Sequence, residues 1–393
     1  MKPARLASLL LIAAALAGCS TISSTVSSTV STVKGWFGVE TVKTQEPSRL
    51  TDFSSSARFE VQWRFGAGSA KDAVLTPAIT SDAVYAASRS GRVYRIERSS
   101  GRSVWGADSG FVISGGVGAG DGLVLVGGSR GEVAAFDESG AQVWTTKVSS
   151  EVQGAPRISN GIVVVRSGDG RIVGLNAANG SRQWAYDHTT PALIVRSHAG
   201  VVIEGGAVYA GFAGGKLVTL RLGDGATYWE ATVSQPRGNT ELERISDITS
   251  DPVVGNGTAC AVSFQGKAAC FDIAQGNPLW SREISSDKGM AGSESSIYLT
   301  DADGSVSGLD RNRGSSLWKN DSLLYRHVSA PGVIGNYAVV GDYDGYLHAL
   351  GGDDGGFAAR IKLDSAIVAA PQGDGDTLFV QTVGGDVYAL SLR

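Results

Sequence analysis

The segment Ala83-Val-Tyr-Ala-Ala-Ser-Arg-Ser-Gly91-Arg-Val-Tyr-Arg-Ile-Glu97-Arg-Ser-Ser-Gly101-Arg-Ser-Val-Trp105 decides the fold of this chain of 393 residues. Two apolar, β-rich runs, 83–88 and 92–97, are joined by a short turn at Gly91, and this pattern predicts a β-hairpin. Glycine suits such a turn because it adopts a positive φ without steric cost. A second turn, at Gly101, leads into a further strand that carries Trp105.

The same order of features recurs eight times along the chain. The first turn glycines follow one another at spacings of 40, 39, 45, 51, 38, 41 and 40 residues, at Gly91, Gly131, Gly170, Gly215, Gly266, Gly304, Gly345 and Gly385. In six repeats a second glycine is followed four residues later by a tryptophan: Gly101/Trp105, Gly140/Trp144, Gly180/Trp184, Gly225/Trp229, Gly276/Trp280 and Gly314/Trp318. A period of about 40 residues built from short strands is typical of a β-propeller blade. We therefore expect an all-β fold, an eight-bladed β-propeller.

The two ends of the repeat region predict how the ring closes. After Gly385 the chain has room for one more strand only, whereas Phe59-Glu-Val-Gln-Trp63 has the pattern of an outer strand with no hairpin before it. We expect the N-terminal strand to pair with the C-terminal strand and complete the eighth blade, which removes two open sheet edges. The seventh repeat has Ala359 at the tryptophan position, so a weaker contact between blades is expected there.

The first residues have the features of an export signal. Positive charge at Lys2 and Arg5 precedes a short apolar run that ends in Gly18-Cys19. This junction resembles the processing box of bacterial lipoproteins, which implies that Cys19 is the lipid-modified first residue of the mature chain. No Asp follows Cys19, so we expect an anchor in the outer membrane, on its periplasmic face. The predicted parts are a lipoprotein signal peptide (1–18), a lipidated flexible tether (19–56) and the propeller (57–393).

Residue types that carry catalysis or bind metals do not form a recognisable group. The four histidines have no metal-ligand spacing, and the chain has no GxSxG, P-loop or dinucleotide motif. A formal net charge of −4 without a basic and aromatic cluster argues against nucleic-acid binding. We predict no catalytic residue, no cofactor and no metal site.

Cys260 and Cys270 flank the turn at Gln265-Gly266 of one predicted hairpin. If the turn centres on Gln265, the two residues face one another across the strands, at a separation that a disulfide tolerates. An oxidising periplasm permits the bond. A disulfide and two buried free thiols both remain open.

The unit Cys270-Phe-Asp-Ile-Ala-Gln-Gly-Asn-Pro-Leu-Trp280 resembles the repeat of pyrroloquinoline-quinone (PQQ) enzymes, in which it docks neighbouring blades. The chain as a whole resembles the BamB family, lipoproteins of the machinery that assembles outer-membrane β-barrels. The resemblance covers the lipoprotein box, the Ser/Thr-rich tether and all eight repeats. Its most specific segments are 191–196, 239–247 and Gly341-Asp-Tyr-Asp-Gly-Tyr-Leu-His348.

The first two of these segments account for the long spacings of 45 and 51 residues. Extra residues in a periodic chain form loops on one face, where propellers commonly bind partners. The resemblance implies contact with the periplasmic domains of BamA, the barrel-embedded subunit, and with the machinery's other subunits. Carried over to this chain, the partner-binding residues are Leu193, Val195, Arg196, Arg244 and Asp247. The family pattern has an acid two residues after the last of these, where this chain has Thr249.

Three functions are compatible with these observations. The favoured one is a non-catalytic scaffold that aids folding and insertion of outer-membrane proteins and that has unfolded clients as further candidate partners. An exported propeller that binds a small ligand or a cell-wall fragment is the alternative, since one fold hosts many functions. A PQQ-dependent dehydrogenase is disfavoured because the resemblance to those enzymes requires adjacent cysteines and a free, cofactor-stacking tryptophan.

Overall fold

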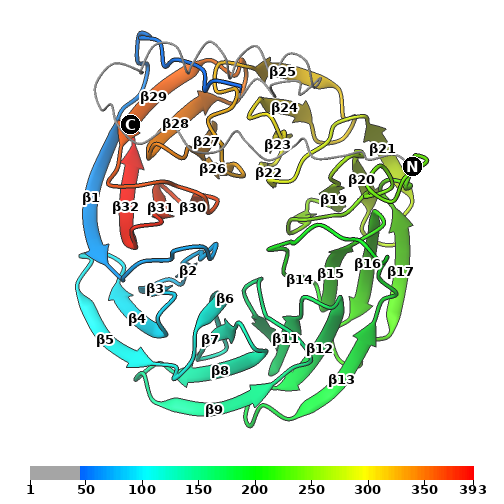
Figure 1. Ribbon diagram of the computed structural model, residues 1–393. Coiled ribbons are helices and arrows are strands. Elements are labelled where there is room, and N and C mark those ends of the chain that lie inside the picture. Colours follow the sequence, from blue (N-terminus) through cyan, green and yellow to red (C-terminus); the bar gives the residue numbers. More distant parts are fainter. Residues whose placement is uncertain (1–44) are drawn as a thin grey trace, which may run out of the picture. The chain divides into compact units, whose positions relative to one another are not determined.

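The computed structural model of this protein describes residues 45–393, and Pro47–Arg393 form one compact unit. The predicted signal peptide, Cys19 and most of the predicted tether lie outside the described residues. The unit is a ring of eight four-stranded antiparallel sheets, which confirms the predicted eight-bladed propeller (Figure 1). Within residues 45–393, no helix is long and apolar enough to cross a membrane.

In blades one to seven the four strands follow one another in sequence, from the central axis to the rim (Figure 1). Blade one consists of β2 (Ala78–Ile79), β3 (Ala83–Ala87), β4 (Arg92–Glu97) and β5 (Ser103–Asp108). Blade two consists of β6 (Ile113–Gly120), β7 (Leu123–Gly128), β8 (Glu132–Asp137) and β9 (Gln142–Lys147). Blade three consists of β10 (Arg157–Ser159), β11 (Ile162–Arg166), β12 (Arg171–Asn176) and β13 (Arg182–Asp187). Blade four consists of β14 (Val202–Glu204), β15 (Ala207–Phe212), β16 (Lys216–Arg221) and β17 (Thr227–Thr232).

The second half of the ring repeats this arrangement, with one exception at the end. Blade five consists of β18 (Val253–Gly255), β19 (Thr258–Val262), β20 (Ala268–Asp272) and β21 (Pro278–Arg282). Blade six consists of β22 (Gly289–Gly292), β23 (Ser296–Thr300), β24 (Val306–Asp310) and β25 (Ser316–Asn320). Blade seven consists of β26 (Gly332–Ile334), β27 (Tyr337–Gly341), β28 (Tyr346–Gly351) and β29 (Phe357–Lys362). Blade eight takes β30 (Gln372–Asp374), β31 (Thr377–Gln381) and β32 (Asp386–Leu392) from the C-terminus, and its outer strand is β1 (Phe59–Gly66).

The pairing of β1 with β32 closes the ring as the sequence predicts. The register runs from Phe59 opposite Leu392 to Gly66 opposite Asp386. Without this pairing, β1 and the outer edge of β32 would be left unpaired, so it satisfies backbone donors and acceptors from the two ends of the repeat region at once.

Each outer-strand tryptophan packs on the second turn glycine of the next blade. The indole of Trp105, for example, lies so close to Gly140 that a Cβ there would be 2.7 Å from Cδ2 of the ring. The indole N–H of Trp105 also donates to the carbonyl of Glu138, at 2.8 Å. Seven tryptophans make this kind of bond to the next blade: Trp63, Trp105, Trp144, Trp184, Trp229, Trp280 and Trp318. They hold the blades together, as large buried rings with one satisfied polar atom do.

The junction from blade seven to blade eight is built differently. Ala359 stands at the tryptophan position there and is 1% exposed. Blade eight has no second turn glycine to receive an indole, because its outer strand comes from the other end of the chain. Ala57 and Phe59 pack in the same buried cluster as Ala359 and fill this space.

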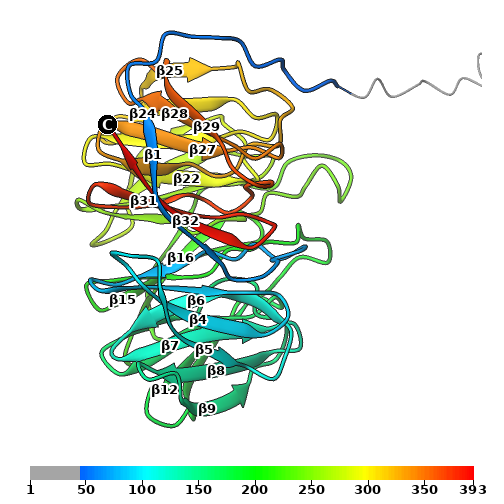
Figure 2. The same ribbon diagram turned by 90° about the vertical axis from the view of Figure 1, so that its left-hand side faces the viewer.

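Residues 47–58, which we call the strap, run along the outside of blade seven before β1 begins (Figure 2, blue). The N–H of Ser48 donates to the carbonyl of Leu324 at 2.9 Å, and Leu50 packs against the buried cluster of blades six and seven. The rings of Phe53 and Phe357 lie 5.4 Å apart. The tether was predicted to extend to residue 56. Ser48, Leu50 and Phe53, which fall in the last part of that range, contact the propeller.

The segment Gly341–His348 forms a polar cluster behind the strap. Arg326 is 7% exposed and pairs with Asp342 at 2.8 Å and Asp344 at 2.7 Å, while its Nη1 donates to the carbonyl of Ser48 at 3.1 Å. The Nη1 of Arg360 donates to the carbonyl of Thr51 at 3.0 Å. Arg326, from the connection between blades six and seven, and Arg360, from β29, therefore hold the strap by its backbone carbonyls.

Candidate partner-binding surface

The two predicted long loops lie at the same face of the ring. Residues 188–201 connect β13 of blade three to β14 of blade four, and residues 233–252 connect β17 of blade four to β18 of blade five. Both connections run from the outer strand of one blade to the inner strand of the next, so the antiparallel order places them at one end of the sheets. Figure 2 shows green and yellow-green loops standing out from that face.

Asp247 ties the two loops together. Its Oδ2 accepts a hydrogen bond from the N–H of Val195 at 2.7 Å, and its Oδ1 accepts one from the N–H of Gly214 at 3.0 Å. The residue is only 3% exposed. Asp247, which the sequence predicts to bind a partner, therefore uses its carboxylate to satisfy backbone donors inside the fold.

A second set of bonds continues this connection toward the ring axis. Oδ1 of Asp251 accepts a hydrogen bond from the N–H of Gly200 at 2.6 Å, and the hydroxyl of Ser197 donates to the carbonyl of Thr249 at 3.1 Å. The hydroxyl of Thr249 donates to the carbonyl of Asp287 at 3.3 Å, in the connection to blade six. Asp251 was not among the predicted residues, although an acid so close to Asp247 in an inserted loop was a usable signal.

The side chains that the first loop presents to solvent are mainly apolar. Leu193 is 39% exposed and the unpredicted Ile194 is 38% exposed, whereas Val195 is half-buried. The guanidinium of Arg196 lies 3.1 Å from both carboxylate oxygens of Glu151, which is in the connection from blade two to blade three. The structure thus holds Arg196 in place at the rim of an apolar patch.

Arg244 belongs to a separate part of the second loop. Its Nε donates to the carbonyl of Gly238 at 3.1 Å, and its Nη1 lies 3.7 Å from Glu241. The turn is closed by Glu243, whose carboxylate accepts the N–H groups of Asn239 and Thr240 at 2.7 and 3.2 Å. These backbone bonds hold the pKa of Glu243 below its usual value. The structure therefore brings Val195 and Asp247 into contact, while the polar contacts of Arg244 stay within its own loop.

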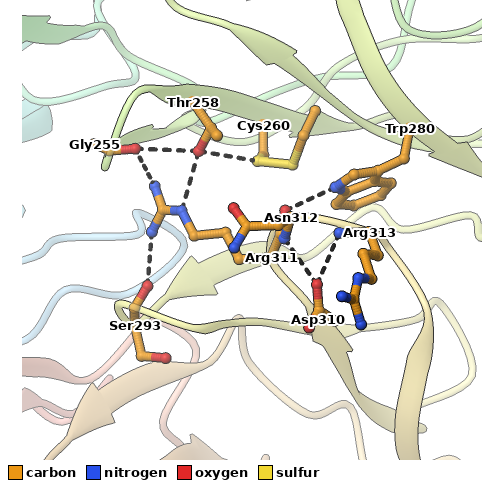
Figure 3. Close-up of a disulfide and its surroundings, with 10 residues drawn as sticks. Gly255, Thr258, Cys260, Trp280, Ser293, Asp310, Arg311, Asn312 and Arg313 are labelled. Atoms are coloured by element: carbon orange, nitrogen blue, oxygen red, sulfur yellow. Dashed lines mark hydrogen bonds between the residues drawn. A yellow bond between two sulfur atoms is a disulfide. The ribbon is translucent and has the colours of Figure 1, made fainter.

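Cys260 and Cys270 are opposite one another in the pairing of β19 with β20 and form a disulfide (Figure 3). Both residues are fully buried in blade five. Next to them, Arg311 donates to Thr258, Ser293 and Gly255 at 3.0, 2.7 and 2.6 Å, which satisfies all three guanidinium nitrogens with neutral acceptors. This region is a buried structural element of the blade.

The described residues differ from the pattern required of a quinone enzyme. The propeller tryptophans all pack between blades, and the two cysteines are ten residues apart in sequence. Within residues 45–393, no group of three or more His, Cys, Asp or Glu side chains is arranged to hold a metal ion. The arrangement on this face is instead suited to contact with another protein, because exposed apolar side chains are held there by a rigid set of buried bonds.

Comparison with known proteins gives one consistent result. The family model described as "Outer membrane protein assembly factor BamB" matches residues 89–320 and 302–393. A protein of that name from Nitrosomonas eutropha is 39% identical over 381 residues, which are 96% of this chain and 92% of that protein. The crystal structure of BamB from Moraxella catarrhalis is similar with a TM-score of 0.78 and 29% identity, over 85% of this chain and 99% of that one.

A quinohemoprotein alcohol dehydrogenase from Comamonas testosteroni is also similar, with a TM-score of 0.66 over 85% of this chain and 76% of that chain. Its sequence is only 14% identical, so this likeness shows the shared propeller fold alone. The family model covers residues 89–393, and the relative from Nitrosomonas eutropha aligns with 96% of this chain. This chain belongs to the BamB family of outer membrane protein assembly factors.

Proposed function

We propose that this protein is a non-catalytic assembly factor of the outer membrane, which binds the periplasmic domains of BamA with the loops 188–201 and 233–252. The observation that carries the proposal is the tie between Asp247 and Val195, which fixes two inserted loops of different blades as one surface. That surface presents Leu193 and Ile194 to solvent beside Arg196. Exposed apolar patches mark protein interaction sites, and arginine is among the residue types enriched in binding hot spots. The names of the relatives support the assembly role.

The proposed binding residues are Leu193, Val195, Arg196, Arg244 and Asp247, in two roles. Leu193 and Arg196 would contact the partner directly, since their side chains are exposed. Asp247 would act by positioning, because its carboxylate is buried against backbone N–H groups. A non-enzymatic role is supported by the seven tryptophans within residues 45–393, each of which packs between blades.

Capture of BamA from solubilised membranes by variants of the full-length protein tests the site. We expect Leu193→Ala and Arg196→Ala to weaken capture, each by about 2 kcal/mol or roughly thirtyfold, at unchanged melting temperature. Leu279→Ala, which removes a side chain 48% exposed on an outer strand, is the matched apolar control. Arg102→Ala is the matched charged control, since that side chain is 79% exposed and also pairs with one glutamate.

Asp247→Ala should differ from these variants. It leaves two buried N–H groups without an acceptor, so we expect weaker capture together with a loss of about 2 kcal/mol in the free energy of unfolding. Normal capture by Leu193→Ala and Arg196→Ala would rule out this surface as the binding site. A lowered melting temperature for those two variants would show that their side chains are structural.

We also propose that Cys19 carries the lipid anchor and places the propeller at the periplasmic face of the outer membrane. The support is the lipoprotein box at the end of the apolar run in residues 6–17. Cys19→Ala should release the protein into the soluble periplasmic fraction or leave it unprocessed, as fractionation and intact mass would show. A normally processed Cys19→Ala protein that still fractionates with the outer membrane would contradict the proposal.

A further inference from the structure

A cleft of about 410 Å³ lies between the loop 188–201 and the ends of blades three and four. Ile194, Val195 and Arg196 of the loop line one side, and Arg166 and Phe212 of the blades line the other. The cleft is therefore continuous with the surface that we propose to bind a partner protein.

Arg166, the last residue of β11, is half-buried in this cleft and makes few polar contacts. Its Nη1 donates to the carbonyl of Ala199 at 3.3 Å, and its guanidinium lies 5.2 Å from the centre of the Phe212 ring. A guanidinium has five N–H donors, so most of them are unused here. Within the described part of the chain, no carboxylate forms an ion pair with Arg166.

The acids around the cleft are engaged with other groups. Glu151 pairs with Arg196, and Asp251 lies 3.5 Å from Arg157. Asp247 uses both oxygens for backbone N–H groups. Burial lowers the pKa of Arg166 to about 10, and the charges of Asp251 and Asp247 act in the opposite direction. The guanidinium is charged at neutral pH, but it has lost hydration without gaining a counter-ion.

The corresponding position in other blades shows what the fold itself requires. At the end of β23, the hydroxyl of Thr300 donates to the carbonyl of Ser329 at 2.9 Å. At the end of β31, the amide of Gln381 donates to the carbonyl of Ala87 at 2.8 Å. One neutral donor is thus sufficient to bridge to the following segment of the ring. The positive charge and the remaining donors of Arg166 have no such structural explanation.

Arg311 shows how this protein satisfies an arginine that is purely structural. All three of its guanidinium nitrogens donate to neutral acceptors within the fold (Figure 3). Arg166 lacks this set of acceptors and faces a cleft instead.

We propose that the cleft receives an acidic side chain, Asp or Glu, of the protein bound by the loop pair, with Arg166 as its ion-pair partner. The guanidinium would donate to the carboxylate in a paired geometry, and the exposed side chain of Ile194 would cover the acid's apolar stem. The inference rests on the proposed function and extends it, because it requires an acid at the centre of the partner's contact surface.

The test uses Arg166→Gln, which keeps one neutral donor as Gln381 does in blade eight and removes the charge. Calorimetry with the purified periplasmic domains of BamA as the probe should show binding weakened about tenfold at unchanged melting temperature. Arg166→Lys should retain part of the affinity, and the salt dependence of binding should fall in Arg166→Gln. Arg102→Gln is the matched control, since that exposed side chain also pairs with one glutamate.

A double-mutant cycle identifies the acid. Each Asp and Glu of the probe is changed to Asn or Gln, and one of these changes should weaken binding to the unaltered protein but not to Arg166→Gln. Unchanged affinity of Arg166→Gln, while Leu193→Ala weakens binding, would overturn the inference and leave the proposed function intact. A loss of affinity that couples to no acid of the probe would also overturn it. If neither Arg166→Gln nor Leu193→Ala has an effect, the proposed function itself fails.

Discussion

At the scale of single residues, His348 shows how a buried polar side chain is made compatible with the core of a blade. It is fully buried on β28, with Nε2 3.1 Å from Oδ2 of Asp342. Its Nδ1 accepts a hydrogen bond from Nε of Arg360, at 3.1 Å. A ring that accepts at Nδ1 is neutral, and protonation there would oppose the arginine donor. Burial holds the pKa of His348 below its usual value, although Asp342 acts in the opposite direction.

The lowered pKa of His348 predicts a loss of stability in mild acid. Because the unfolded chain binds this proton more readily than the native one, the free energy of unfolding falls as pH decreases below about 6.5. Burial lowers the pKa of the half-buried His188 as well, which gives the same sign. Urea unfolding at pH 7.5 and 5.5 should show a smaller loss for His348→Gln than for the unaltered protein. Equal losses would contradict this role of His348.

At the scale of elements, residues 47–56 of the strap are exposed or half-buried on the outside of the ring, so their release can be separated from unfolding of the ring. The ring of Phe53 lies against that of Phe357, and the guanidinium of Arg360 is 4.9 Å from the centre of the Phe53 ring. Phe53→Ala removes this stacking, and we expect trypsin to cut after Arg49 several times faster while the melting temperature changes little. The control is Val104→Ala, which alters a valine 56% exposed on an outer strand. Trypsin should cut this variant after Arg49 at the same rate as the unaltered protein. Slow cutting in Phe53→Ala would show that the arginine contacts suffice.

At the scale of the whole molecule, ring closure makes one blade junction unlike the others. A repeat consensus would place tryptophan at residue 359, but Ala57 and Phe59 already fill the space beside Ala359. We therefore expect Ala359→Trp to destabilise the protein by about 1–3 kcal/mol through overpacking. Trp184→Phe, at an ordinary junction, should lose about 1 kcal/mol because the indole bond to Leu222 disappears. Denaturant unfolding measures both changes, and a stabilised Ala359→Trp would contradict this account of closure.

The sequence by itself determined the number of blades, their hairpins and the closing pair of strands, because short-range periodicity and turn glycines specify repeated local structure. It also located the two inserted loops, since extra residues stand out against a regular period. The tertiary structure alone decided that Asp247 is buried and that Arg166 faces a cleft. Those facts depend on which backbone groups of distant blades come within hydrogen-bond distance, as the 2.7 Å bond between Asp247 and Val195 does. The contacts of the strap with blades six and seven were likewise decided by the tertiary structure, because residues 47–58 lie far from those blades in the sequence.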